Sequence, residues 1–286
     1  LSPYRLVLIL SEGSFSCVKA ANSLGFVSHD HLTRELTREF RPNPIGDWEK
    51  LPRKGVLVID DTVIAKPHSE VIEGVKWQYA SSKDKVLPGI NLLLGLWVIG
   101  ETVYVLEVFF PGDENRNELV QALLKRVKEE GLEVERVLSD AWYAASKTLN
   151  LIHTLGWTYV CRMRSNRIFN GEAIETYAFH GAQGKTGKLK GVYANIQIVK
   201  HDDRYLVTNE LTPHTSRTLA HSYGERWVLE TVFRDLKSIL HLEKCSCRNL
   251  EAQSNHALSV LAASLSSSQH SRRSTRVSQA IPMPSL

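Results

Sequence analysis

One segment near the C-terminal end combines residue types that handle phosphate chemistry. Its polar side chains are one acid, two cations and a phenol: Tyr223, Arg226, Glu230 and Lys237. The run 223–237 has no Pro and is rich in helix-forming residues, which predicts a helix. At about 100° per residue the four side chains fall within roughly 60° of one another, on a single stripe.

The spacing along this helix separates the acid from the last cation. A rise of about 1.5 Å per residue puts Lys237 roughly 10 Å beyond Glu230, too far for a salt bridge. The arrangement suits an acid that acts at one point and cations that bind phosphates on either side. The alternative is the solvated face of an ordinary amphipathic helix. An adjacent stripe is apolar: Leu229, Val232, Phe233, Leu236, Ile239 and Leu240.

Further carboxylates follow two predicted strands. The aliphatic run after Gly55 predicts a buried strand that ends at Asp60 and Asp61, and the strand 134–140 ends at Asp140. A strand end can hold an acid rigidly at a cleft. For the adjacent pair Asp60 and Asp61, a polar turn after a strand is the alternative interpretation.

The order of predicted elements is strand, strand, strand, helix, strand, helix, strand. The strands are 55–59, 90–99, 102–110, 134–140 and 157–163, and the helices are 117–130 and 141–155. This is the order of the RNase H-like fold, an α/β fold with a mixed sheet flanked by helices. A helical crossover permits the first and fourth strands to pair in parallel. Asp61 and Asp140 would then face each other at neighbouring strand ends.

The spacing Y-(2)-R-(3)-E-(6)-K resembles the signature of DDE transposases of bacterial insertion sequences, in the YREK group (the insertion-sequence-four family). The resemblance covers about residues 50–260. Asp61, chosen over Asp60 because it directly precedes Thr62, resembles the first acidic motif of the family. Asp140, after Ser139, resembles the second acidic motif, and Glu230 the third.

The resemblance implies metal-dependent chemistry on double-stranded DNA. Asp61, Asp140 and Glu230 would be the catalytic residues and would hold Mg²⁺, with two ions expected and Mn²⁺ able to substitute. DNA would be contacted by Tyr223, Arg226 and Lys237. The expected reaction is cleavage at transposon ends and strand transfer into target DNA, by a homodimer. The alternatives are an RNase H-like nuclease without transposition and a non-catalytic, transposase-derived DNA-binding protein.

Three domains are expected. Residues 1–50 predict a small helical unit, and a Gly25 turn and a Ser28 N-cap favour a helix-turn-helix whose Arg34 and Arg38 could contact DNA. A simple helical hairpin is the alternative. Because the chain begins at Leu1, this unit is a candidate for truncation. Residues 51–265 would form the catalytic domain with a β-rich, basic insertion at about 164–215. A disordered tail would follow over 266–286.

Composition narrows the class of protein. Hydrophobic residues make up 43% and charged residues 23% of 286 residues, which is typical of a globular chain with a substantial core. A net charge of +4 permits an anionic partner. Four Cys without a disulfide framework, and no signal peptide, favour a cytoplasmic protein. A zinc site at His241, Cys245, Cys247 and His256 is disfavoured by the Cys-x-Cys spacing.

Overall fold

The computed structural model describes residues 3–10, 16–37, 48–67, 71–80, 83–179 and 181–271. The chain forms two compact units. One unit joins Leu1–Pro44 to Asp235–Leu286, and the other is the continuous segment Ile45–Arg234. In the described part of the chain, no helix is long and apolar enough to cross a membrane.

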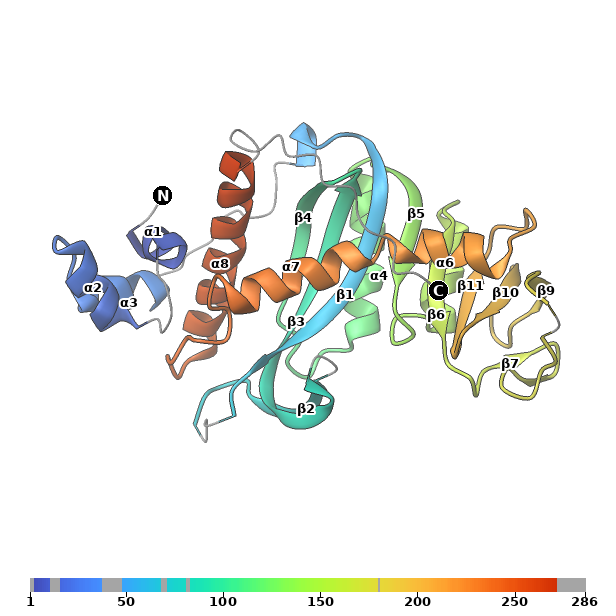
Figure 1. Cartoon of the computed structure of the whole chain (residues 1–286), viewed down its shortest axis with the longest axis horizontal. Coiled ribbons are helices and arrows are strands. Elements are labelled where there is room, and N and C mark those ends of the chain that lie inside the picture. The colour runs from blue at the N-terminus through green and yellow to red at the C-terminus, as the bar shows by residue number, and fades with distance from the viewer. Residues whose placement is uncertain are drawn as a thin grey trace. The chain divides into compact units, whose positions relative to one another are not determined.

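A mixed sheet is the centre of the larger unit (Figure 1). Its strands are β1 (Lys54–Ala65), β2 (Lys76–Ala80), β3 (Lys85–Ile99), β4 (Thr102–Phe109), β5 (Glu133–Ser139), β6 (Tyr159–Met163), β9 (Lys185–Lys188), β10 (Asn195–His201) and β11 (Arg204–Thr208). The order is β2-β3-β1-β5-β6-β11-β10-β9, with β4 also paired to β3. β1 runs antiparallel to β3 and parallel to β5, which is parallel to β6. The predicted RNase H-like arrangement is confirmed.

Two helices share the main hydrophobic core with the sheet. They are α4 (Arg116–Glu129) and α5 (Ser146–Thr154). Leu57 and Ile59 of β1 belong to this core together with Leu123 of α4. At Gly95 of β3 an added Cβ would lie 2.4 Å from a methyl carbon of Leu123, so the missing side chain lets the helix approach the sheet closely.

The predicted β-rich insertion extends the main sheet. β10 and β11 form the expected hairpin, which turns between His201 and Arg204. β11 then pairs antiparallel with β6, and this continues the sheet beyond the predicted catalytic strands. A separate two-stranded sheet pairs β7 (Ile168–Phe169) with β8 (Glu172–Ala173).

Several predicted boundaries are wrong. The segment 66–85, expected to be irregular, contains β2, a strand of only five residues in which polar and aromatic side chains alternate and Trp77 and Tyr79 are exposed. The strand predicted to end at Asp60 and Asp61 continues to Ala65. The helix predicted from residue 141 begins at Ser146. The single signature helix is two helices, α6 (Ser216–Gly224) and α7 (Trp227–Ser238).

The smaller unit is helical. Its helices include α1 (Pro3–Leu10), α2 (Cys17–Leu24), α3 (His29–Thr37) and α8 (Leu250–Ser271), and a short 3-10 helix, Trp48–Lys50, opens the larger unit. Gly25, with φ of 70°, ends α2 as predicted, and its N–H bonds to the Ala21 carbonyl at 3.0 Å. The His31 N–H bonds to the Ser28 hydroxyl oxygen, which confirms the predicted cap.

The helices predicted as a separate N-terminal domain pack against the C-terminal helix α8. Asn255 Nδ2 donates to the Leu36 carbonyl at 2.7 Å, and the Tyr4 hydroxyl lies 2.6 Å from His256 Nδ1. α8 continues to Ser271, past the predicted start of the disordered tail. The rest of that tail, 272–286, lies outside the described residues.

Candidate active site

Asp60 and Asp61 lie inside β1 and point to opposite faces of the sheet, because successive side chains of a strand alternate. Leu57 and Ile59, on the Asp61 side, pack in the core with α4. Asp61 continues that row and meets Arg116, the first residue of α4. Asp60 therefore faces the other side of the sheet.

Asp60 and Glu230 are joined by a shared arginine. Arg226 Nη1 forms an ion pair with Asp60 Oδ2, and Arg226 Nη2 donates to Glu230 Oε1 at 2.7 Å. Asp60 and Arg226 are each only 15% exposed. Tyr223 adds its ring, whose centroid lies 5.4 Å from the Arg226 guanidinium carbon. Arg226 thus brings Glu230 of the signature segment together with Asp60 of β1.

Asp140 lies beside Asp60 because of the strand register. In the parallel pair β1 and β5, Ile59 is opposite Ser139, so the next residues along each strand direction are Asp60 and Asp140. Asp140 Oδ1 accepts the Trp142 N–H, which fixes the carboxylate at the start of the following turn. The sequence predicts that Asp61 faces Asp140, whereas the register of β1 and β5 puts Asp60 beside Asp140 and Asp61 one position further along.

The electrostatics link these groups into one cluster. Burial raises the pKa of Asp60 from 3.8 to about 7. The positive charge of Arg226 acts against this rise, and the negative charges of Asp140 and Asp61 add to it. Burial alone would lower the pKa of Arg226, but the charges of Asp60, Tyr223, Glu230 and Asp140 outweigh it and the pKa rises. The guanidinium therefore stays charged among three acids.

Asp61 has a different set of partners. Its Oδ1 accepts a 2.6 Å hydrogen bond from the Tyr143 hydroxyl, and its Oδ2 accepts from Asn91 Nδ2 and from Arg116 at 3.1 Å. Burial and then the charge of Asp61 raise the pKa of Tyr143, so the phenol remains a donor. Both oxygens of Asp61 are thereby engaged by neighbours on its own face.

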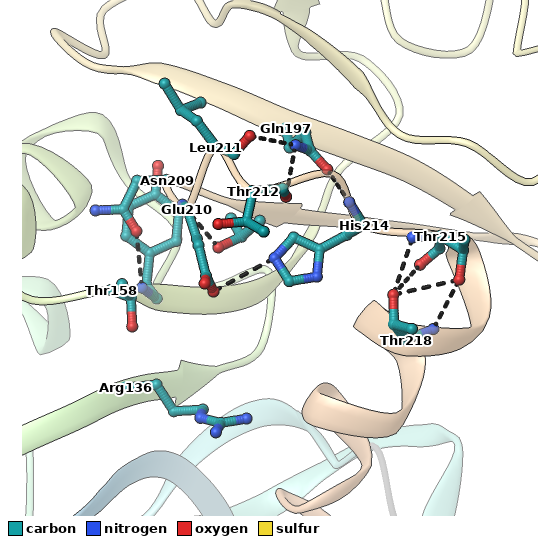
Figure 2. A network of polar contacts seen from close by, with 12 residues as sticks. Arg136, Thr158, Gln197, Asn209, Glu210, Leu211, Thr212, His214, Thr215 and Thr218 are labelled. Carbon is teal, nitrogen blue, oxygen red and sulfur yellow. Dashed lines mark hydrogen bonds and ion pairs between the residues drawn. The ribbon is translucent and has the colours of Figure 1, made fainter.

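A polar network fixes the chain just before α6 (Figure 2). The buried Gln197 donates from Nε2 to the carbonyls of Leu211 and Thr212, and its Oε1 accepts the His214 N–H at 2.8 Å. A capping box of Thr215 and Thr218 then begins α6. Because α6 leads directly to Tyr223 and Arg226, this network sets where the signature segment starts.

A model of one protein family matches most of the chain. The Transposase DDE domain matches residues 51–266, which include all the acids described above. The chain belongs to this family.

Other comparisons add little to this assignment. No curated protein matches the chain. Among solved structures, the Drosophila P element transposase strand transfer complex is similar, with 16% identity and a TM-score of 0.28. The match covers 55% of this chain and 40% of that one, so the chain spans well under half of that transposase. The family assignment rests on the match to residues 51–266.

The predicted DNA-binding residues of this DDE-family chain lie on different elements. Tyr223 lies near the end of α6, and Arg226 lies between α6 and α7. Of the four signature residues, only Glu230 and Lys237 share a helix. Lys237 belongs to the smaller unit and forms an ion pair with Glu243 at 3.8 Å. In that unit Arg34 is exposed on α3, where its Nε donates to the Asp30 carbonyl at 3.2 Å. Arg38 lies outside the described residues.

Carboxylates are suitable ligands for a hard divalent cation, although the carboxylates of the described residues do not form a ready-made metal site. Within the described residues, no three His, Cys, Asp or Glu side chains form a group that could hold a metal ion. Asp60, Asp140 and Glu230 supply carboxylate oxygens, the ligands that Mg²⁺ prefers. The Arg226 guanidinium lies among them and provides the compensating charge. The disfavoured zinc alternative gains no support, since His256 hydrogen-bonds through Nδ1 to Tyr4 and through Nε2 to the His241 carbonyl.

Sequence reasoning missed several residues around these acids. Asn91, Arg116 and Tyr143 come from three different elements, and no local spacing marks them as partners of Asp61. Trp142 was assigned to a helix, whereas it lies in the turn before α5. For Trp142, the sequence offers one signal of a place near the acids, which is its position two residues after the strand-end acid Asp140.

Proposed function

We propose that this chain is a DNA transposase of the insertion-sequence type, in the YREK group, which cleaves phosphodiester bonds at transposon ends and transfers the strands to target DNA. The observation that supports this most strongly is the convergence of Asp60, Asp140 and Glu230 around Arg226 in a Transposase DDE domain. The signature segment Y-(2)-R-(3)-E-(6)-K supports the finer group.

The proposed metal-binding acids are Asp60, Asp140 and Glu230. The step Asp61-Thr62 resembles the first acidic motif of the family, but the contacts of Asp60 with Arg226 favour Asp60 as the first acid, and we assign Asp61 a positioning role. Bound Mg²⁺ ions, two in number, would activate water and neutralise charge on the departing oxygen. Arg226 and Tyr223 would contact phosphates near the scissile bond.

The protein's own charges suggest how DNA and these acids are coupled. Without DNA, Arg226 neutralises Asp60 and Glu230. A DNA phosphate offers the guanidinium a bidentate partner, and Arg226 would then release carboxylate oxygens for Mg²⁺. We further propose a homodimer, one protomer for each transposon end.

The test is cleavage of DNA that carries the repeats flanking the gene, in Mg²⁺, Mn²⁺ or EDTA. We expect metal-dependent nicking at the repeat ends followed by joining to target DNA, because three carboxylates are available to hold the metal. Glu230→Gln should reduce nicking by about 10²- to 10³-fold, as loss of one preorganised electrostatic group does.

Glu225→Gln is the matched control, because Glu225 is a neighbouring acid that forms its ion pair with Arg136, at 3.3 Å, and is not one of the three proposed metal ligands. This variant should cleave at the wild-type rate. Nicking without joining would replace the proposal with an RNase H-like nuclease. Binding without nicking in any metal would replace it with a non-catalytic DNA-binding protein.

A further inference from the structure

One glutamine of the β-rich insertion lies where an apolar residue would be expected. Gln197 is in β10 and is only 2% exposed, and its neighbours Ile196 and Ile198 belong to the main core. Because successive side chains of a strand alternate, Gln197 points away from that core, toward the loop before α6 (Figure 2). Its backbone lies between Thr186 of β9 and Thr208 of β11. The amide group is therefore carried by a rigid part of the sheet.

The amide of Gln197 makes three hydrogen bonds to the loop before α6. Nε2 donates to the carbonyls of Leu211 and Thr212, at 3.3 Å and 3.0 Å, and Oε1 accepts the His214 N–H at 2.8 Å. Neither a carboxylate nor an apolar side chain of similar size could make all three bonds, because only an amide both donates and accepts. Loss of the amide would leave partly buried backbone groups without their partners.

A second segment of the insertion, just before β9, holds the same loop. The Gly184 N–H bonds to the His214 carbonyl at 2.9 Å, and the Ser216 N–H bonds to the Ala182 carbonyl at 2.7 Å. Gly184 also leaves room for the glutamine, because an added Cβ would lie 2.7 Å from Gln197 Oε1. The insertion thus determines where the first turn of α6 begins.

The helix α6 connects this first turn to the acid cluster. It has nine residues, which at about 1.5 Å per residue make a rod of roughly 14 Å. Leu219 is buried, and α6 contacts β6, β10 and β11. The Arg226 N–H bonds to the Tyr223 carbonyl at 3.0 Å, which joins Arg226 to the end of the helix. A displacement of the first turn would therefore move the backbone that carries the Arg226 guanidinium.

We propose that Gln197 is a positioning residue for Arg226, and that the β-rich insertion thereby sets the guanidinium between Asp60 and Glu230. For cleavage, this inference rests on the proposed function, because the acid cluster is the proposed catalytic centre. The placement of Arg226 without DNA is independent of that function. The competing explanation is that the two ion pairs alone place Arg226, while Gln197 only stabilises the insertion.

Phenylglyoxal, which reacts with arginine guanidinium groups, tests the placement of Arg226 without metal or DNA. The protein is treated in EDTA, and the modification rate of each arginine is measured by mass spectrometry. Arg226 of the wild type should react slowly, because it is 15% exposed and pairs with Asp60 and Glu230. Gln197→Met should raise the rate at Arg226 severalfold. The exposed Arg34 should react at the same rate in both proteins.

A second variant and a matched control separate positioning from general destabilisation. Gly184→Ala retains the glutamine but displaces it, so it should also raise the rate at Arg226. Gln253→Met is the control, because Gln253 is equally buried and donates to the carbonyls of Cys245 and Cys247 before α8, in the smaller unit. The control should leave the rate at Arg226 unchanged, and thermal melting measures how far each variant is destabilised.

Cleavage in Mg²⁺ adds a double-variant cycle with Arg226→Lys. Gln197→Met alone should slow nicking about tenfold, as loss of a supporting residue does. In the Arg226→Lys background it should slow nicking less than about twofold, because residues that act through one another are not additive.

Equal modification of Arg226 in the wild type, Gln197→Met and Gly184→Ala would overturn the inference. So would an equal rise in Gln253→Met, or effects of Gln197→Met and Arg226→Lys on cleavage that simply multiply. If Gln197→Met and Gly184→Ala expose Arg226 but the wild type does not nick DNA in any metal, the positioning assignment stands and the transposase proposal fails.

Discussion

Asp60→Asn is expected to slow metal-dependent cleavage much more strongly than Asp61→Asn does. Asp60 faces Arg226 and lies beside Asp140, so its loss removes a charge from the centre of the cluster. We expect a rate reduction on the order of 10³-fold. Asp61 orients Tyr143, Asn91 and Arg116 from the other face, and loss of such a supporting residue costs about 10- to 100-fold.

The measurement is the single-turnover cleavage rate of the two variants in Mg²⁺. Asp203→Asn serves as the control, since Asp203 is an exposed turn residue whose carboxylate lies 3.8 Å from Arg204 Nε. Thermal melting of each variant separates loss of chemistry from loss of folding. The reverse order, with an inactive Asp61→Asn and an active Asp60→Asn, would restore Asp61 as the first acid.

Arg226→Met is expected to destabilise the larger unit strongly at alkaline pH. It leaves Asp60 and Glu230 without their shared cation, and loss of one partner of a buried ion pair costs about 3–5 kcal/mol. Arg136→Met is the control, because its pair with Glu225 is partly exposed and should contribute less than about 1 kcal/mol.

The pH dependence of that loss has a defined sign. The pKa of Asp60 is about 7 in the folded state, above its ordinary 3.8, so the folded state holds this proton more tightly than the unfolded state. Asp60 therefore lowers the stability as pH rises from about 4 to about 7. At pH 5 the carboxyl of Asp60 is protonated in the folded state, and Arg226→Met should cost less there than at pH 8.

Urea unfolding in EDTA at pH 5 and pH 8 measures this difference. The double variant Asp60→Asn, Arg226→Met should regain stability at pH 8, because the unpaired buried carboxylate is gone. Equal destabilisation at both pH values, or no recovery in the double variant, would show that Arg226 acts through packing and not through the charge of Asp60.

The sheet could be predicted because its strands are long aliphatic runs. The run Val56–Ile59 and the run that leads to Asp140 are both aliphatic enough to predict buried strands. The helix between them permits the two strands to pair in parallel. The register that sets Asp60 beside Asp140 could not be derived, since the end of β1 was placed too early. Alternation separates Asp60 from Asp61, but only the packing of α4 shows which face each one occupies.

The partners of the acids depend on contacts between distant parts of the chain. The spacing of Arg226 and Glu230 is that of neighbouring helical positions, and they do pair. The ion pair of Arg226 with Asp60 joins residues 166 positions apart, which no local pattern encodes. The break before α7 follows Gly224, a poor helix former that the continuous-helix prediction passed over.

The most direct test of the metal site requires no knowledge of the transposon ends. Fe²⁺ is bound in place of Mg²⁺, ascorbate and peroxide are added, and the sites of backbone cutting are mapped by mass spectrometry. If Asp60, Asp140 and Glu230 hold the metal, cuts fall near these three residues, fade with excess Mg²⁺ and are lost in Asp60→Asn. Cuts elsewhere, or a pattern that Asp60→Asn leaves unchanged, would contradict the assignment of the active site.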